Sequence, residues 1–121
     1  MRLLVVAVIG IVLVCAGCGR QSRAPKPLTL QEFAVEMEKA FRDASPPAKE
    51  LCRELTTAVA ARRYAEAQQA VEMLLALDDL KEEQRLVANR AMLTVMSELQ
   101  AAQAQGNAEA AAAVQRYRGE R

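Results

Sequence analysis

Several residue types that build enzyme and metal sites are missing or scarce in this chain of 121 residues. It has no His, so neither a His general base nor a His metal ligand is present. It also has no Trp, only 3% aromatic residues, and no Gly between positions 20 and 105. That gap excludes a glycine-rich phosphate loop there. A β-sandwich or barrel, which needs aromatic and β-branched strands with frequent turns, does not fit this composition.

Neither sign of charge predominates. The 16 Lys and Arg residues nearly balance the 15 Asp and Glu residues, which leaves a net charge of +1. Because nucleic-acid-binding proteins carry a strongly basic surface, we expect no nucleic-acid partner. The length allows one small domain. The chain is rich in Ala, with 24 residues, and the helical periodicity described below predicts an all-α bundle of four or five helices.

The first 18 residues form an apolar leader that ends in a cysteine. Arg2 supplies a positive charge, and the apolar run over 3–14 is shorter than a membrane-spanning helix requires. The small residues Ala16 and Gly17 then precede Cys18. This arrangement resembles the lipobox of bacterial lipoproteins, in which a signal peptidase cleaves before the cysteine and its thiol receives a lipid. An uncleaved signal anchor or an ordinary secretory signal is the alternative.

The resemblance implies a domain organisation and a location. Residues 1–17 would be the signal peptide, cleaved between Gly17 and Cys18. The lipidated Cys18 would begin a flexible tether over 18–27, followed by the helical domain over 28–121. The covalent lipid, with palmitate among its acyl chains, would be the only prosthetic group and would attach the protein to a membrane. In the family, a residue such as Gly19 after the cysteine favours the outer membrane. We therefore expect a position in the bacterial cell envelope, facing the periplasm.

The helical domain opens with a strong start signal. Thr29 and Glu32 match a capping box, and Ser45 with Pro46 predicts the start of the next helix. The first helix should bury one apolar stripe, which consists of Leu30, Phe33, Ala34, Met37, Ala40 and Phe41.

The segment from 48 to 77 contains two apolar stripes with different phases. The first consists of Leu51, Cys52, Leu55, Ala58 and Val59, and the second of Tyr64, Ala67, Val71 and Leu74. One straight helix cannot bury both against one neighbour, so we expect a turn near Arg62-Arg63, with a single bent helix as the alternative. The run from Ala61 to Ala67 resembles the turn of a tetratricopeptide repeat. That resemblance implies an antiparallel hairpin with a concave surface suited to protein binding.

The C-terminal part should contain one long helix and one short helix. Asp79 with Glu82 predicts the start of a helix that runs from Leu80 to Ala104. Gly106 provides a stop and Asn107 a new cap. The last helix, 108–118, is rich in Ala. We expect it to bury little and to fray. The expected buried face of the long helix consists of Val87, Ala88, Ala91, Met92, Val95, Leu99 and Ala102.

No cluster of residues indicates catalysis or metal binding, so we predict that the protein is not an enzyme and has no catalytic, metal or cofactor-binding residues. Cys52, the one thiol left after lipidation, should be buried, because it lies in an apolar stripe. We expect the methionines beyond the leader (Met37, Met73, Met92 and Met96) to fill the core.

These observations predict a lipid-anchored helical domain that binds another protein. A structural spacer of the envelope, similar to the murein lipoprotein, and a ligand- or ion-sensing module are the alternatives. A homo-oligomer is a further alternative.

Overall fold

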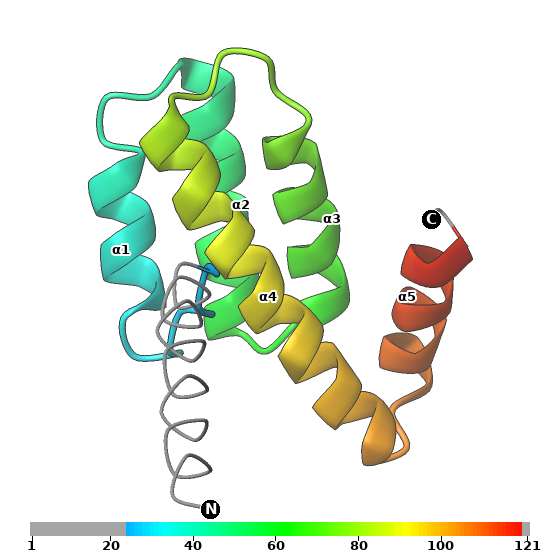
Figure 1. Ribbon diagram of the computed structural model, residues 1–121. Coiled ribbons are helices and arrows are strands. Elements are labelled where there is room, and N and C mark those ends of the chain that lie inside the picture. The colour runs from blue at the N-terminus through cyan, green and yellow to red at the C-terminus, as the bar shows by residue number, and fades with distance from the viewer. Residues whose placement is uncertain (1–23, 120–121) are drawn as a thin grey trace, which may run out of the picture.

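The computed structural model describes residues 24–119, which form five α-helices and contain no β-strand. The predicted all-α bundle is therefore confirmed. Helices α2 and α3 form a hairpin, α4 crosses in front of it, α1 lies to one side and α5 packs on the other (Figure 1). Within residues 24–119, no helix has the length and apolarity needed to cross a membrane. The helices are α1 (Phe33–Ala40), α2 (Pro46–Ala60), α3 (Tyr64–Leu75), α4 (Glu82–Ala104) and α5 (Ala108–Gly119).

Helix α1 begins after a short turn and buries a narrower stripe than expected. The backbone N–H of Glu32 donates to the Thr29 hydroxyl at 3.1 Å. The Glu32 carboxylate, however, accepts a hydrogen bond from Arg90 on α4 at 3.4 Å. Leu30 and Ala34 are exposed, which contradicts the predicted stripe, because Leu30 lies in the turn before the helix and Ala34 faces solvent. The residues of this stripe that are fully buried are Phe33, Met37 and Phe41.

Helix α2 begins where the sequence predicted, with Ser45 at the N-cap and Pro46 at N1. The Ser45 hydroxyl nevertheless makes no capping bond and is buried without a partner. Pro47 at N2 has no N–H, so of the two donors that an N-cap side chain can use only the N–H of Ala48 at N3 remains, and Ser45 does not bond it.

The chain reverses at residues 61–63, so the predicted hairpin is confirmed and the bent-helix alternative is wrong. The N–H of Arg63 donates to Ala58 O at 2.8 Å, and that of Arg62 donates to Val59 O at 3.0 Å. This is the Schellman pattern of helix ends, with Arg62 in the left-handed region at φ 60°. Behind the turn, the two stripes form the centre of the core and include Leu55, Val71 and Leu74, which have no exposed surface.

Helix α4 begins two residues later than expected, at Glu82. The predicted cap at Asp79, with Glu82 at N3, is wrong. Instead, the N–H of Lys81 donates to the Gln84 side chain at 2.9 Å. Arg85 explains the shift, because its guanidinium donates to the carbonyls of Leu75 and Leu77, each at 3.0 Å. These bonds hold the loop against the first turn of α4, so the helix starts only beyond it.

The end of α4 and the start of α5 follow the sequence signals. Gly106 has φ +88°, and the N–H of Asn107 donates to Ala102 O at 3.1 Å. The Asn107 side chain then accepts the N–H of Ala110 at 3.0 Å. Helix α5 packs on α4 and α3 and buries more than expected, because small side chains allow close helix approach. Its buried residues are Ala110, Ala113 and Val114.

Candidate functional site

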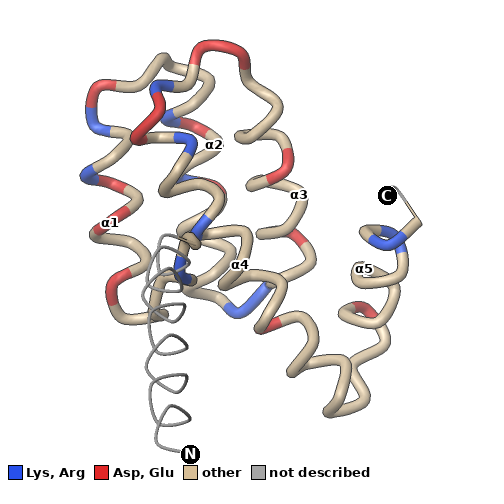
Figure 2. Tube along the Cα trace, in the orientation of Figure 1, with Lys and Arg blue, Asp and Glu red and all other residues tan. Residues whose placement is uncertain are grey.

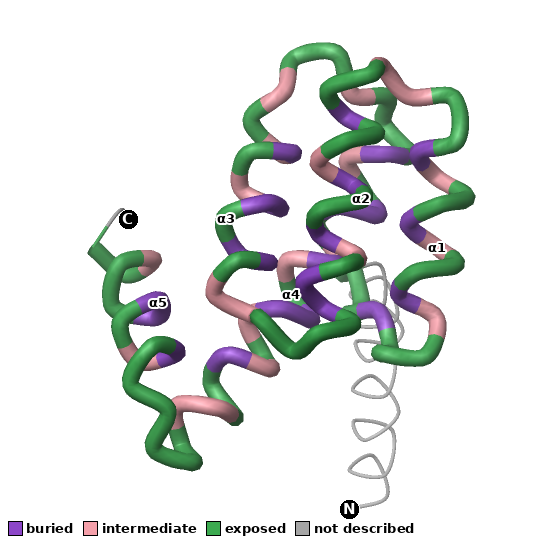
Figure 3. The backbone as a smooth tube through the Cα atoms, turned by 180° about the vertical axis from the view of Figure 1, so that it is seen from behind, coloured by how far each residue is buried: buried purple, intermediate pink, exposed green. Residues whose placement is uncertain are grey.

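The outer surface of the α2–α3 hairpin carries a groove of about 350 Å³, here called the hairpin groove. Seen from behind, α2 and α3 lie on the side of the bundle opposite α4 (Figure 3). Met73, at 59% exposure, is the most exposed large apolar residue along it. The groove is lined by Arg53, Glu54, Thr57, Ala58, Arg63, Glu66, Gln69, Ala70 and Met73.

Charged side chains around the hairpin groove are largely paired within their own helices. Arg53 forms an ion pair with Glu50 on α2, and Arg63 lies 3.2 Å from Glu66 at the start of α3. These pairs are exposed, so each contributes little to stability and can exchange for a partner's charges. The groove therefore offers an apolar Met73 between groups of both signs, which is the mixture found at protein-binding surfaces.

Tyr64 occupies the position where the sequence resembles a tetratricopeptide-repeat turn. It lines a hollow with Leu30, Arg62 and Glu98, at the end of the bundle where the hairpin turns. Burial raises the pKa of the Tyr64 hydroxyl, and the nearby Glu98 carboxylate raises it further. The phenol therefore stays protonated at neutral pH, as a hydrogen-bonding group rather than a base.

Cys52 is buried, as predicted, with 5% exposure. Its thiol donates to the carbonyl of Met37 at 3.7 Å. Burial, with a smaller contribution from Glu38, raises the pKa of this thiol to about 11. Since the thiolate is the reactive form, a thiol with this pKa is a poor nucleophile at neutral pH. Cys52 thus contributes packing between α1 and α2.

The prediction that all four methionines fill the core is wrong for Met73. Met37 has no exposed surface, and Met92 and Met96 are partly buried against the core. Met73 is exposed because the buried stripe of α3 follows Val71 and Leu74, and Met73 lies between them on the opposite side. The spacing of the apolar residues in α3 therefore already indicated that Met73 is exposed.

Three polar residues are buried within the bundle, and sequence patterns alone did not identify them. Thr94 donates to Leu28 O at 2.6 Å, which fixes the segment before α1 against α4. Gln68 donates to Glu72 at 3.0 Å, while its side-chain oxygen is buried without a partner. Gln84 caps α4. Their burial depends on neighbours distant in sequence, so local periodicity does not predict it.

The exposed surface of α4 differs from that of α2 in the number of charged residues. Every exposed residue from Leu86 to Ala104 is uncharged, whereas α2 exposes Lys49, Glu50, Arg53 and Glu54. In Figure 2, the half of α4 that leads to α5 is correspondingly almost entirely tan. This exposed surface, here called the α4 ridge, consists of Leu86, Asn89, Leu93, Ser97, Gln100, Ala101 and Ala104.

Residues 24–119 contain no group of three or more acidic or cysteine side chains placed to hold a metal ion. The predicted cleavage and lipidation residues, Gly17 and Cys18, lie outside the described residues. The contacts of the helical domain begin inside the expected tether 18–27, since Arg90 donates to Lys26 O at 2.9 Å.

Comparison of this chain with protein family models, with curated proteins and with solved structures found no match.

Proposed function

We propose that this chain is a bacterial envelope lipoprotein whose helical domain binds a protein partner in the hairpin groove. The leader and Ala16-Gly17-Cys18 support the anchor, and the groove beside exposed Met73 supports the binding site. Two or three acyl chains on Cys18 would hold the domain at the membrane. Gly19 after the cysteine favours the outer membrane, with the domain in the periplasm.

The observation that carries the binding proposal is the exposure of Met73 over this groove. A flexible thioether side chain adapts to an apolar partner surface, and the flanking Arg53 and Glu66 supply charges of both signs for orientation. A partner segment with one apolar anchor and mixed charges therefore fits the groove. Such chemistry describes binding of a protein segment rather than conversion of a substrate.

The binding proposal is tested by site-specific photo-crosslinking in cells. A crosslinking residue at Gln69, inside the groove, should capture a specific protein, whereas one at Lys39 on α1 should not. The Met73→Glu variant should abolish the Gln69 crosslink, because it places a charge at the apolar centre. Val35→Glu is the matched control, since Val35 is also exposed, at 63%, but lies on α1. Equal loss in both variants would contradict a role for the groove.

The anchor is tested separately by mass spectrometry of protein extracted from membranes. The expected mature chain begins at Cys18 and carries the mass of a diacylglyceryl group. An intact Met1, or an unmodified Cys18 at the terminus, would refute the anchor without affecting the groove.

A further inference from the structure

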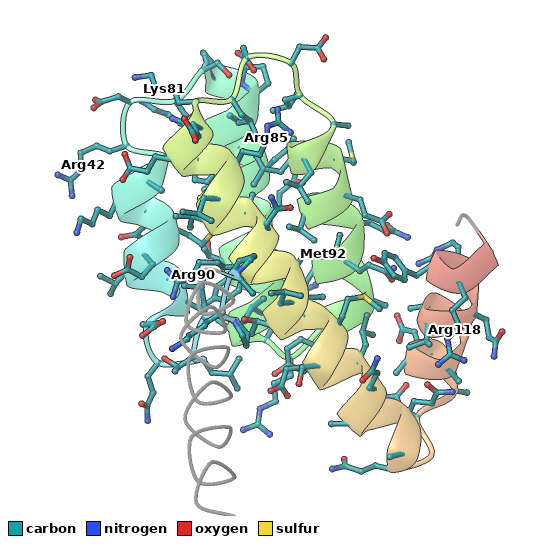
Figure 4. All side chains as sticks on the ribbon, in the orientation of Figure 1. Arg42, Lys81, Arg85, Arg90, Met92 and Arg118 are labelled. Carbon is teal, nitrogen blue, oxygen red and sulfur yellow. The ribbon has the colours of Figure 1, made fainter. Side chains whose placement is uncertain are left out.

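The N-terminal segment of the described chain is attached to one particular face of the domain. Arg90 of α4 donates to Lys26 O at 2.9 Å, and Thr94 of α4 donates to Leu28 O at 2.6 Å. In Figure 4, Arg85 and Met92 lie on the side of α4 that faces α3, while Arg90 lies on the side that faces α1. The chain that leads to the proposed anchor therefore leaves the domain beside the α4 ridge.

The distance between this point and the anchor is limited by chain length. Lys26 follows Cys18 by eight positions, and an extended chain spans at most about 3.5 Å per position, or about 28 Å in total. Helix α4, with 23 residues, is about 35 Å long. A lipid on Cys18 thus keeps Lys26, which is bound beside the α4 ridge, within about 28 Å of the bilayer, so the ridge meets a high effective concentration of headgroups.

The residue composition of the α4 ridge is typical of a protein surface that contacts lipid. Leu86 and Leu93 are 50% and 41% exposed and are seven residues apart, so both lie on one side of α4. The other exposed residues of the ridge are small or uncharged and polar, namely Asn89, Ser97, Gln100, Ala101 and Ala104. Lys26 is exposed at the edge of this surface, and Arg20 and Arg23 precede it in the sequence. Apolar side chains flanked by cations are typical of contact with anionic headgroups.

We propose that the α4 ridge lies against the headgroup region of the membrane that holds the anchor, so that the hairpin groove on the opposite side faces away from it. This inference rests on the proposed lipid anchor and adds an orientation to it. Carboxylates lie at the margins of the ridge and not within it: exposed Glu82 is one turn before Leu86 on the same side of α4, and Glu32 is paired with Arg90. Glu82 and Glu83 lie in the first turn of α4, before Leu86, and Glu98 lines the hollow with Tyr64.

A second copy of the chain fits the α4 ridge less well than a membrane surface does. A stable protein interface buries roughly 800 Å² per partner around a packed apolar centre, and the ridge offers two leucines among Asn, Ser, Gln and Ala. A membrane contact needs much less intrinsic affinity, because the lipid on Cys18 already holds the domain at the surface.

The test uses the full lipidated protein, reconstituted into phosphatidylcholine vesicles with about 30% phosphatidylglycerol. An environment-sensitive fluorophore is attached at Ser97→Cys on the ridge or at Gln69→Cys in the hairpin groove, and the unsubstituted protein measures labelling of buried Cys52. Spin-labelled lipids near the headgroups should quench the Ser97 probe at least about threefold more than the Gln69 probe. The paired substitution Leu86→Gln with Leu93→Gln should remove this difference, whereas Val35→Gln with Met73→Gln should preserve it.

The outcomes separate the two proposals. Protein that floats with the vesicles but shows equal quenching at Ser97 and Gln69 overturns the orientation and leaves the anchor intact. A Ser97 probe that responds to protein concentration and crosslinks to a second copy, without lipid quenching, also overturns it. Protein that fails to float with the vesicles refutes the anchor and the orientation together.

Discussion

The α2–α3 and α4–α5 hairpins turn through the same hydrogen-bond pattern but bury different side chains. In both, the residue after the helical C-cap is left-handed: Arg62 at φ 60° in the first and Gly106 at φ +88° in the second. The first hairpin packs Leu55, Val71 and Leu74 in the centre of the core, with no exposed surface. The second is closed by the small side chains of α5.

The difference shows when a sequence needs glycine at a turn. A side chain in the left-handed region destabilises the turn by roughly 1 kcal/mol. Burial of several large apolar residues outweighs this strain, since each contributes about 2 kcal/mol. The first hairpin can therefore tolerate Arg62. The second, whose α5 arm buries two alanines and one valine, has at its turn the residue that fits without strain.

The largest expected effect comes from Val59→Asp in the first hairpin. Val59 is 7% exposed, so the substitution buries a carboxylate without a partner. We expect the free energy of unfolding to fall by about 3 kcal/mol or more, measured by urea denaturation. Thr57→Asp, at an exposed position of the same helix, is the control and should change it little. Similar midpoints for both variants would contradict a tightly packed first hairpin.

Val114→Asp should act on the second hairpin alone. Val114 is 1% exposed, but α5 is the last described helix and packs mainly on α4 and α3. The expected result is local: α5 detaches, proteases cleave near Gly106, and the remaining bundle keeps its unfolding transition. Ala112→Asp, which is exposed, should leave α5 protected. Global unfolding by Val114→Asp as severe as that by Val59→Asp would remove the distinction between the hairpins.

The titration of the Cys52 thiol measures how well the α2 side of the first hairpin is shielded from solvent. Because the folded-state pKa of its thiol is raised from the ordinary value of 9.0 to about 11, the folded state holds the proton more tightly than the unfolded state. Stability from this group is present below the unfolded pKa and is lost as pH rises toward 11, by at most about 2 kcal/mol. Urea midpoints between pH 8 and 11 should fall less steeply for Cys52→Ala. Identical slopes would show that the thiol titrates freely.

The smallest expected effects come from separate substitutions of the two turn residues in the left-handed backbone conformation, Gly106 and Arg62. Gly106→Ala should destabilise the second hairpin by about 1 kcal/mol, because a Cβ there meets no atom within 4 Å and only backbone strain acts. Arg62→Gly should stabilise the first by about 0.5 kcal/mol, since strain relief exceeds the added unfolded-state entropy. Arg62→Ala is the control and should change little, as alanine keeps the Cβ. Thermal unfolding measures all three, and a stabilising Gly106→Ala would be inconsistent with the left-handed turn.

Much of the fold followed from local sequence signals. The phase change between Val59 and Tyr64 predicted the reversal, and Gly106 with Asn107 predicted the second turn. These signals work because helix periodicity and capping depend on residues within a few positions of each other. The candidate groove was predicted only in part. The sequence predicted the hairpin that forms it, but it wrongly predicted that Met73 is buried.

The sequence alone determined the helical composition, the two reversals and the burial of Cys52, because each depends on backbone propensity or on the phase of one apolar stripe. The tertiary structure decided what depends on contacts between distant segments. Arg85 moved the start of α4 by holding the preceding loop, and close packing of α5 buried its alanines. Thr94 and Arg90 bound the segment before α1 and thereby selected the face of the domain from which the chain leads to Cys18. No local pattern encodes such contacts, because their partners are brought together only when the helices pack.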